Sequence, residues 1–300
     1  MHRELMSHPH IGSFSALLLL AFLAAYLLAR YNASRATFSP RHIDNQALLL
    51  VALSMAGARF FSWLFYFPAG ASFWKAMMSV DGGLVFYGGM IFSAAGAILY
   101  LVLARLSICE LADVWAAPVA LGLAIGRVGC FMAGCCWGDV CIPPERANAL
   151  SDSVMLRQVY SIPLLSRPNF PLAVRFPPET GAYEQQKELG LLDAQAAESL
   201  PVHPAQLYEA AAVFALAIFL QRRFLQRPIP GSVFAALGLG YGGIRFLVEF
   251  FRADNPPIYF GLTLSQVISI FFVGGIIVLR LRKRAPQIQP ALLPIKQPLE

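Results

Sequence analysis

Seven apolar runs, each close to the length that a helix needs to cross a bilayer, constrain the fold of this chain more than any other feature. The hydrocarbon core of a membrane is about 30 Å thick, and a helix that rises about 1.5 Å per residue crosses it with about 20 apolar residues. We therefore expect an all-α membrane protein, a bundle of seven transmembrane helices that forms one polytopic domain over residues 1–300. The runs lie at about residues 12–29, 46–67, 84–104, 113–133, 205–220, 231–251 and 261–280.

The composition excludes most other classes of protein. Hydrophobic residues make up 57% of the chain and charged residues 13%, about half the charged share of a soluble domain. Five cysteines are too few for a disulfide scaffold. The first run is also open to interpretation as a signal peptide. Against that, it is longer than the usual signal-peptide core, and Arg30 and Arg35 follow it without a clear small-residue cleavage site.

The Lys and Arg residues between the runs predict the orientation of the bundle. Twelve of them fall in one set of short loops and in the C-terminal tail, whereas the opposite short segments hold Arg3, Lys75 and Arg252. Because cytoplasmic loops carry the basic excess, we expect the N-terminus outside and the C-terminus in the cytoplasm, with a loose tail at 285–300. The polar, proline-rich stretch 139–203 then forms an extracytoplasmic cap between the fourth and fifth helices. The net charge of +6 reports topology, and we expect no nucleic-acid partner.

Charged side chains inside the apolar runs indicate a site at one depth in the membrane. Arg59, Arg127 and Arg245 fall within three different runs. The helical rise places each of them about 20–21 Å above the cytoplasmic end of its helix. Tyr87, on a fourth helix that runs the other way, lies about 5–6 Å below the outer surface. We therefore expect four helices to bring polar side chains to one layer in the outer leaflet.

The sixth helix carries the longest polar stripe, because Tyr241, Arg245 and Glu249 follow one another at intervals of four residues. A salt-bridge network that locks the bundle is one interpretation, but three arginines would then share a single nearby carboxylate, Glu249. Surplus guanidinium groups at headgroup depth favour an anion, and the planar fork of arginine suits phosphate. We therefore predict a phospholipid-headgroup site that opens to the outer leaflet.

Four sequence blocks follow one another along the chain, namely DGGLVFYGG (81–89), GRVGCFMAGCCWG (126–138), HPAQLYE (203–209) and GYGGIRFLVEFFR (240–252). Together with the seven runs, these blocks resemble the prolipoprotein diacylglyceryl transferase family. The resemblance implies a multi-pass enzyme of the bacterial inner membrane with its site facing the outer leaflet. Members of the family transfer the diacylglyceryl group of phosphatidylglycerol to the lipobox cysteine thiol of a prolipoprotein and release glycerol phosphate. We expect these two substrates as partners, and no cofactor.

The resemblance also implies roles for residues of this chain. Arg127 matches the arginine that opens the family's signature loop and Gly138 the glycine that closes it, and with Arg59 and Arg245 they form the expected binding site for the lipid phosphate. We expect Glu249 to orient Arg245. The expected catalytic residues are Tyr87, Tyr241, Arg245 and Glu249. The expected residues of the pocket and its lip are His203, Gln206, Tyr208, Glu209, Cys130 and Cys135.

Three positions depart from the family pattern and bear on proton transfer. Tyr87 stands where the family usually has a histidine proposed as a catalytic base, and Cys130 and Cys135 stand for its signature asparagine and acidic residue. An ordinary phenol, with a pKa near 10, is a sluggish base, so His203 at the lip is a candidate replacement. The alternative function is a non-enzymatic lipid- or metal-binding relative that kept the bundle, but the retained arginines favour the enzyme.

Four cysteines gather where the fourth run reaches the outer side, namely Cys130, Cys135, Cys136 and Cys141. Disulfides form in that compartment, so a structural disulfide or plain packing of small buried residues is the favoured interpretation. A metal site and a redox or acyl-carrying thiol are the alternatives. Because the spacing C-x4-CC-x4-C is not a standard zinc pattern, we assign no metal.

Overall fold

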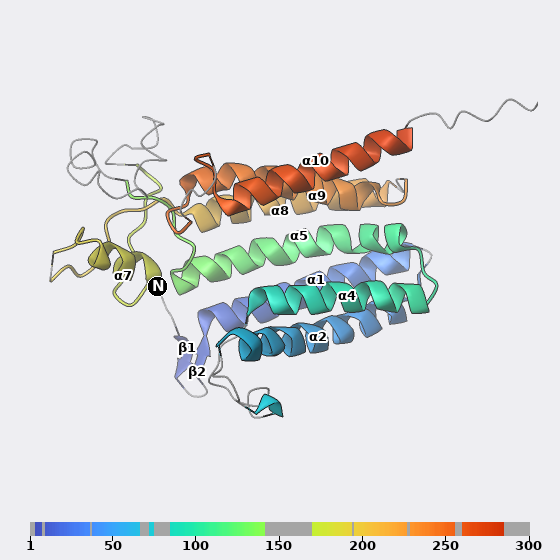
Figure 1. Ribbon diagram of the computed structural model, residues 1–300, viewed down its shortest axis with the longest axis horizontal. Helices are drawn as coiled ribbons and strands as arrows, with labels where there is room; N and C mark the ends of the chain where they lie inside the picture. The colour runs from blue at the N-terminus through green and yellow to red at the C-terminus, as the bar shows by residue number, and fades with distance from the viewer. Residues whose placement is uncertain are drawn as a thin grey trace, which may run out of the picture.

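The computed structural model describes residues 4–7, 10–36, 38–66, 72–74, 85–141, 170–193, 195–226, 229–255 and 260–284, so the expected tail at 285–300 lies outside the described residues. In these residues the chain is a bundle of long helices with a cap at one end (Figure 1). A helix lies at each of the seven ranges expected from the sequence. These helices are α1 (Ser13–Arg35), α2 (Pro40–Tyr66), α4 (Phe86–Leu103), α5 (Ile108–Ala133), α8 (Ala205–Leu225), α9 (Ser232–Val248) and α10 (Leu264–Arg284).

Short elements complete the described chain. Helix α7 (Gly181–Glu188) lies in the cap, and the 3-10 turn η3 (Glu249–Phe251) continues α9. Strands β1 (Glu4–Ser7) and β2 (His10–Gly12) form an antiparallel hairpin before α1. The hairpin is an exception to the expected all-α fold, because it lies in a short polar stretch outside the apolar runs.

The outer surface of the bundle is apolar. Leu19, Leu48 and Phe271 are 70%, 73% and 76% exposed, where a soluble protein would keep such side chains inside. By length and composition, four helices can cross a membrane, and two shorter apolar helices accompany them. The four are Ser13–Arg35, Pro40–Phe65, Ile108–Ala133 and Ser232–Phe251, and the shorter ones are Gly88–Leu103 and Leu264–Val278. The fold is therefore that of a helical membrane protein.

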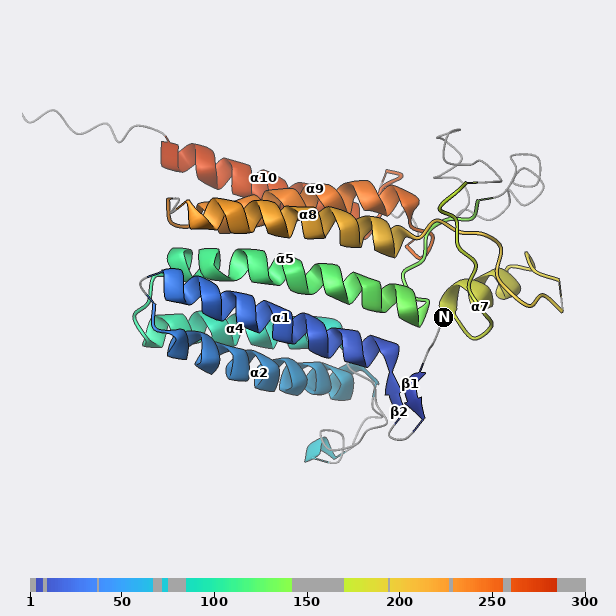
Figure 2. The same ribbon diagram turned by 180° about the vertical axis from the view of Figure 1, so that it is seen from behind.

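Helix α5 runs through the middle of the bundle. Helix α1 packs on one side of α5 and α8 with α9 on the other, while α2 and α4 pair with each other farther from α9 (Figures 1 and 2). Small side chains let the backbones of α5, α8 and α9 approach closely, which allows their polar residues to meet. The buried residues of this packing are Ala116, Ala117, Ala120, Ala124, Val213, Ala217, Leu220, Val233 and Leu237.

One buried carboxylate fixes the height of α9 relative to α5. Asp113, in the second turn of α5, accepts hydrogen bonds of 2.7 Å from the backbone N–H groups of Gly231 and Phe234, and so caps the N-terminus of α9. Arg127 follows Asp113 by 14 residues, and Arg245 follows Gly231 by 14 residues. Both arginines therefore lie about 21 Å along their helices from one shared contact, and the common depth expected for them with Arg59 and Tyr87 stays a prediction.

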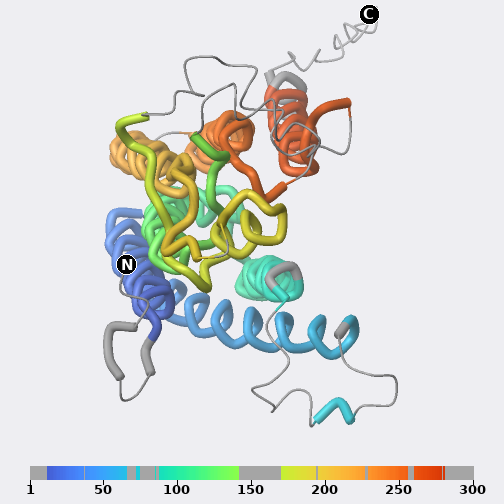
Figure 3. The backbone as a smooth tube through the Cα atoms, turned by 90° about the vertical axis from the view of Figure 1, so that its left-hand side faces the viewer, coloured from blue at the N-terminus to red at the C-terminus, as the bar shows by residue number. Residues whose placement is uncertain are grey.

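The described part of residues 139–203 lies across one end of the bundle (Figure 3), at the same end as the β1–β2 hairpin (Figure 1). Residues 138–141 pair with residues 201–203, because the N–H of Gly138 donates to His203 O at 3.0 Å and the N–H of His203 donates to Asp139 O at 2.9 Å. This pairing seats the cap on the ends of α5, α8 and α9. A small apolar core inside the cap consists of Val140, Phe176, Ala182 and Val202.

Candidate active site

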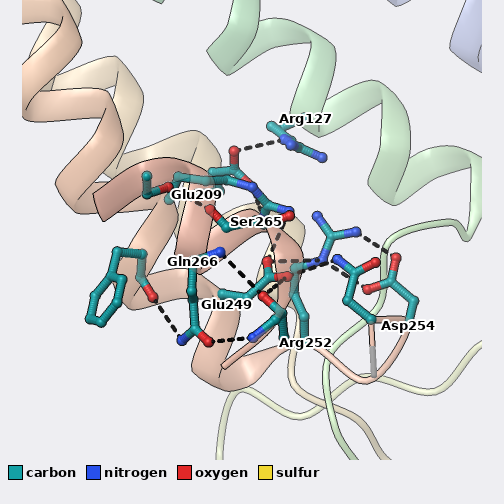
Figure 4. Close-up of polar contacts among 12 residues, drawn as sticks. Arg127, Glu209, Glu249, Arg252, Asp254, Ser265 and Gln266 are labelled. Atoms are coloured by element: carbon teal, nitrogen blue, oxygen red, sulfur yellow. Dashed lines mark hydrogen bonds and ion pairs between the residues drawn. The ribbon is translucent and has the colours of Figure 1, made fainter. Parts of the chain in front are cut away.

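Polar side chains of α5, α8 and α9 meet at the cap end of the bundle (Figure 4). Arg127 lies near the end of α5, and Arg245 lies in the last turn of α9. Glu209 lies in the second turn of α8, which starts beneath the cap and runs in the opposite direction. All three side chains therefore reach the same level from different helices.

The carboxylate of Glu209 joins the three helices. Its Oε1 lies 3.0 Å from Arg127 Nε and accepts a hydrogen bond from the Tyr241 hydroxyl at 3.3 Å, while its Oε2 lies 3.7 Å from Arg245 Nη1. The Glu209 side chain is 2% exposed, so water screens these ion pairs weakly. Glu209, expected at the lip of the pocket, instead lies at the centre of the site.

Glu249 forms a second charged centre directly after α9. Its Oε2 lies 2.8 Å from Arg245 Nη2, and its Oε1 accepts hydrogen bonds of 2.8 Å from the Thr263 hydroxyl and the Asn255 amide. Arg245 Nη2 also donates to Ser265 Oγ at 3.1 Å. Because Glu249 is completely buried and held from three sides, it is well placed to fix the orientation of Arg245.

Arg252 is a third guanidinium of the site, although its place in the sequence suggested an external loop. It binds the Asp254 carboxylate through both Nε and Nη2, and its Nε lies 3.9 Å from Glu249. Among the described residues of this cluster, three arginines therefore face three carboxylates, including Glu209. The expected arrangement of several arginines around one carboxylate is wrong, because the fold brings Glu209 from α8 to the arginines and the neighbouring Asp254 pairs with Arg252.

The balanced network still leaves donors for a ligand. Arg245 Nη1 is buried and has no hydrogen-bond partner among the described residues. Arg127 is 18% exposed and uses Nε for its ion pair, so within the described chain its two terminal nitrogens, which form the planar edge, make no ion pair. Phosphate oxygens accept bidentate hydrogen bonds from such an edge. The arrangement can therefore hold a phosphate between α5 and α9.

Two further residues of the HPAQLYE block, His203 and Gln206, are buried, whereas Tyr208 is partly buried. His203 is fully buried, its Nδ1 lies 3.2 Å from the Tyr208 hydroxyl, and its ring packs edge-on against Phe170 and Phe251. The expected position of His203 at the lip is wrong, because the cap and η3 cover it. Gln206 is also buried, and its amide donates to the backbone oxygen of the signature loop at residue 135, at 2.7 Å.

Gly138 lies where the signature loop passes closest to its neighbours. A Cβ at this position would meet the backbone oxygens of His203 and Phe251. The N–H of Gly138 already donates to His203 O. Close packing therefore accounts for the glycine, and its part in phosphate binding stays a prediction.

Two of the expected site residues are not placed in this cluster by the described structure. Arg59 is on α2, across the bundle from α9 (Figure 1). Tyr87 is in the first turn of α4, but its side chain lies outside the described part of the chain. Their roles stay predictions.

All five cysteines belong to the described residues, and none forms a disulfide. The Sγ atoms of Cys130, Cys135 and Cys136 lie within 4.8 Å of one another. Cys141 is buried separately, and burial together with the nearby Asp139 raises the pKa of its thiol to about 12. Burial also raises the pKa of Asp139 to about 7, against the opposing effect of a hydrogen bond from the Val140 N–H.

A network of arginines and carboxylates, buried at the capped end of a bundle of apolar helices, defines a helical membrane protein with a charged internal site. The family model described as prolipoprotein diacylglyceryl transferase matches residues 4–281. The chain belongs to this family, as its four sequence blocks indicated.

Three curated relatives carry the name phosphatidylglycerol–prolipoprotein diacylglyceryl transferase. The protein of Clostridium tetani is 25% identical over 263 residues, which are 88% of this chain and 89% of the relative. The protein of Bordetella avium is 29% identical, with 92% of each chain covered. The protein of Xanthomonas campestris pv. campestris is 30% identical over 218 residues, 71% of this chain and 65% of the relative. The similarity therefore extends over most of this chain.

Proposed function

We propose that this chain transfers the diacylglyceryl group of phosphatidylglycerol to the lipobox cysteine of prolipoproteins, the first step of bacterial lipoprotein maturation. Its family and the names of its relatives support the reaction class. The main structural support for the site comes from the guanidinium of Arg245. Its buried Nη1 has no hydrogen-bond partner in the described chain and lies beside the Glu209–Arg127 pair.

The reaction requires that the two substrates are held in place and that the developing negative charge is stabilised. The acceptor thiol loses its proton to water and its sulfur attacks the glycerol carbon that bears the phosphodiester. The C–S bond forms as the C–O bond breaks, and glycerol phosphate leaves with the electron pair. Arg127 and Arg245 approach the phosphate from two helices and stabilise the charge that develops on the leaving oxygen. Glu249 orients Arg245, and Glu209 balances both arginines before the lipid binds. Holding donor and acceptor together removes much of the entropic barrier.

We also propose how the chain is oriented in the membrane. The seven long helices cross the inner membrane as one polytopic domain, with the N-terminus and the cap of residues 139–203 outside and the C-terminus, with the tail at 285–300, in the cytoplasm. The cap, the hairpin and the charged site share one end of the bundle, whereas Arg105, Arg222 and Arg223 lie at the other end, as expected for basic cytoplasmic loops. The site then faces the outer leaflet, at the level of lipid phosphates.

An assay with defined substrates tests this function. The purified full chain is mixed with phosphatidylglycerol and a lipobox peptide, and the thioether peptide and glycerol phosphate are measured by mass spectrometry. Arg127→Ala and Arg245→Ala should each lower the rate at least about 100-fold. Arg223→Ala, an exposed arginine at the far end of α8, is the matched control and should leave the rate unchanged.

Two results would overturn the proposal. One is phosphatidylglycerol binding without either product, the behaviour expected of the non-enzymatic alternative. The other is full activity in both active-site arginine variants, which would remove the phosphate clamp from the mechanism.

A further inference from the structure

Three cysteines converge beside the active site. Cys130 lies in the last turn of α5, and Cys135 and Cys136 follow the end of the helix. Their Sγ atoms lie within 4.8 Å of one another, and all three residues are partly buried. Residues five and six positions apart do not share a helical face, so the chain must reverse direction to bring these thiols together.

Left-handed backbone at two positions makes this reversal. Gly134 has φ of 68° and Cys136 has φ of 60°. Glycine adopts this conformation freely, but for cysteine it costs about 1–2 kcal/mol. Hydrogen bonds hold the reversed segment, because the Cys135 N–H donates to Cys130 O at 3.1 Å and the buried Gln206 amide donates to Cys135 O at 2.7 Å. The three thiols therefore sit on a fixed backbone.

Three thiols at this spacing suit one metal ion better than a disulfide. A disulfide joins two sulfurs and leaves the third unused. A zinc–sulfur bond is about 2.3 Å long, so three sulfurs around a tetrahedral ion lie about 3.8 Å apart, and side-chain rotation covers the difference. A ligand set of sulfurs alone selects a soft ion such as Zn²⁺. Three protein ligands also leave one tetrahedral position for another ligand.

The thiol cluster borders the charged site. Cys130 follows Arg127 by one turn on α5, and the positive charges of Arg252 and Arg127 both act on Cys136. Three thiolates and one Zn²⁺ carry a net charge of about −1, which neighbouring guanidinium groups compensate. Gln206, which anchors the cluster, precedes Glu209 by one turn on α8. A fourth ligand on the ion would therefore lie beside the proposed phosphate site.

The proposed reaction needs an ionised acceptor thiol. An ordinary cysteine has a pKa near 8.5 and is mostly protonated at neutral pH. In the described site the carboxylates of Glu209, Glu249 and Asp254 are each paired with an arginine, so none of them is a ready base. A bound metal ion deprotonates a coordinating thiol outright.

We propose that Cys130, Cys135 and Cys136 bind one Zn²⁺ ion as thiolates and that its fourth position takes the cysteine thiol of the acceptor. This inference rests on the proposed function and names the group that activates its nucleophile. When the acceptor binds, its S–H proton passes to water. The metal-held sulfur then forms the C–S bond while the C–O bond to phosphate breaks, glycerol phosphate leaves with the electron pair, and the thioether, a weaker ligand, leaves the ion.

Metal counting tests the site. The reduced, detergent-purified full chain is loaded with Zn²⁺ or Co²⁺, and metal per chain is measured by elemental analysis. We expect one ion per chain and sulfur-to-cobalt charge-transfer bands in the Co²⁺ form. Cys130→Ser should weaken binding at least about 100-fold without changing the unfolding temperature. Cys109→Ser, an exposed cysteine at the opposite end of α5, is the matched control and should bind normally.

Peptide binding tests the fourth position. A lipobox peptide should change the Co²⁺ spectrum, and the same peptide with serine in place of cysteine should not. The metal site is refuted if the chain binds no stoichiometric metal or if Cys130→Ser binds metal normally. The acceptor role is refuted if the cysteine peptide leaves the Co²⁺ spectrum unchanged. Full transferase activity after metal removal overturns the zinc proposal while the transferase function stands. A peptide-dependent spectrum without transfer product instead refutes the transferase function alone.

Discussion

Replacing Glu209 by glutamine removes the charge that Arg127 and Arg245 share and preserves the shape of the side chain. Two guanidinium groups then surround a neutral amide in a nearly water-free place. A bound anion would restore the balance, so the variant should be less stable than the natural chain and should respond more strongly to an anionic lipid.

The distances give the size of the effect. At an effective dielectric constant near 20, ion pairs at 3.0 Å and 3.7 Å are worth about 5.5 and 4.5 kcal/mol before desolvation. Removing one partner of a buried pair costs about 3–5 kcal/mol in net stability, because desolvation offsets much of the attraction. At about 2–4 °C per kcal/mol, the unfolding temperature of Glu209→Gln should fall by roughly 10 °C.

Circular dichroism during heating measures this in a neutral, phosphate-free detergent, with and without added phosphatidylglycerol. Glu198→Gln, an exposed glutamate of the cap, is the matched control and should melt like the natural chain. The lipid should raise the unfolding temperature of Glu209→Gln more than that of the natural chain. A fall of less than about 3 °C, or the same lipid effect in both proteins, would refute the idea that Glu209 stands in for a ligand phosphate.

Three further predictions concern single positions. Arg245→Lys should lower kcat roughly 100-fold with little change in KM, because lysine lacks the fork that meets Glu249 and a phosphate together, and steady-state kinetics checks this. Gly138→Ala should lower the free energy of unfolding by about 3 kcal/mol, because its Cβ meets backbone oxygens that cannot rotate away; thermal unfolding tests it, and an unchanged melting curve contradicts it. Asp139→Asn should flatten the pH dependence of stability. Burial raises the pKa of Asp139 from 3.8 to about 7, so the folded state keeps a proton that the unfolded chain releases, and stability falls by up to about 4 kcal/mol as the pH rises from about 4 to 7. Melting at pH 5 and pH 8 should therefore differ less in Asp139→Asn than in the natural chain, and an equal difference would contradict the raised pKa.

The helices of this fold were predictable because apolar length is a local property of the sequence. The common height of Arg127 and Arg245 was also predictable, since helical rise converts residue number into distance. What the sequence does not show is the contact between Asp113 and Gly231 that makes the two heights comparable.

The composition of the site was harder to predict. In the sequence, Glu209 is a residue near the start of a predicted helix and Asp254 is part of a loop. Neither position indicates that the carboxylate pairs with a buried arginine. The convergence of the three thiols depends on a positive φ at Cys136, a conformation that cysteine rarely adopts and no local pattern indicates. The β1–β2 hairpin lies in a polar stretch without apolar periodicity.

The hydrogen bonds that Asp113 accepts from Gly231 and Phe234 limit where α5 and α9 can change in length. Deleting or inserting one residue between Asp113 and Arg127 would move that arginine about 1.5 Å and turn it about 100° away from Glu209, while Arg245 stayed in place. A matched change in both helices would carry the pair together but away from Glu209, which is anchored from the other end by the cap. Length changes that keep both arginines beside Glu209 are therefore confined to the residues before Asp113 and Gly231, and the 14-residue spacing from that contact to each arginine has to stay constant.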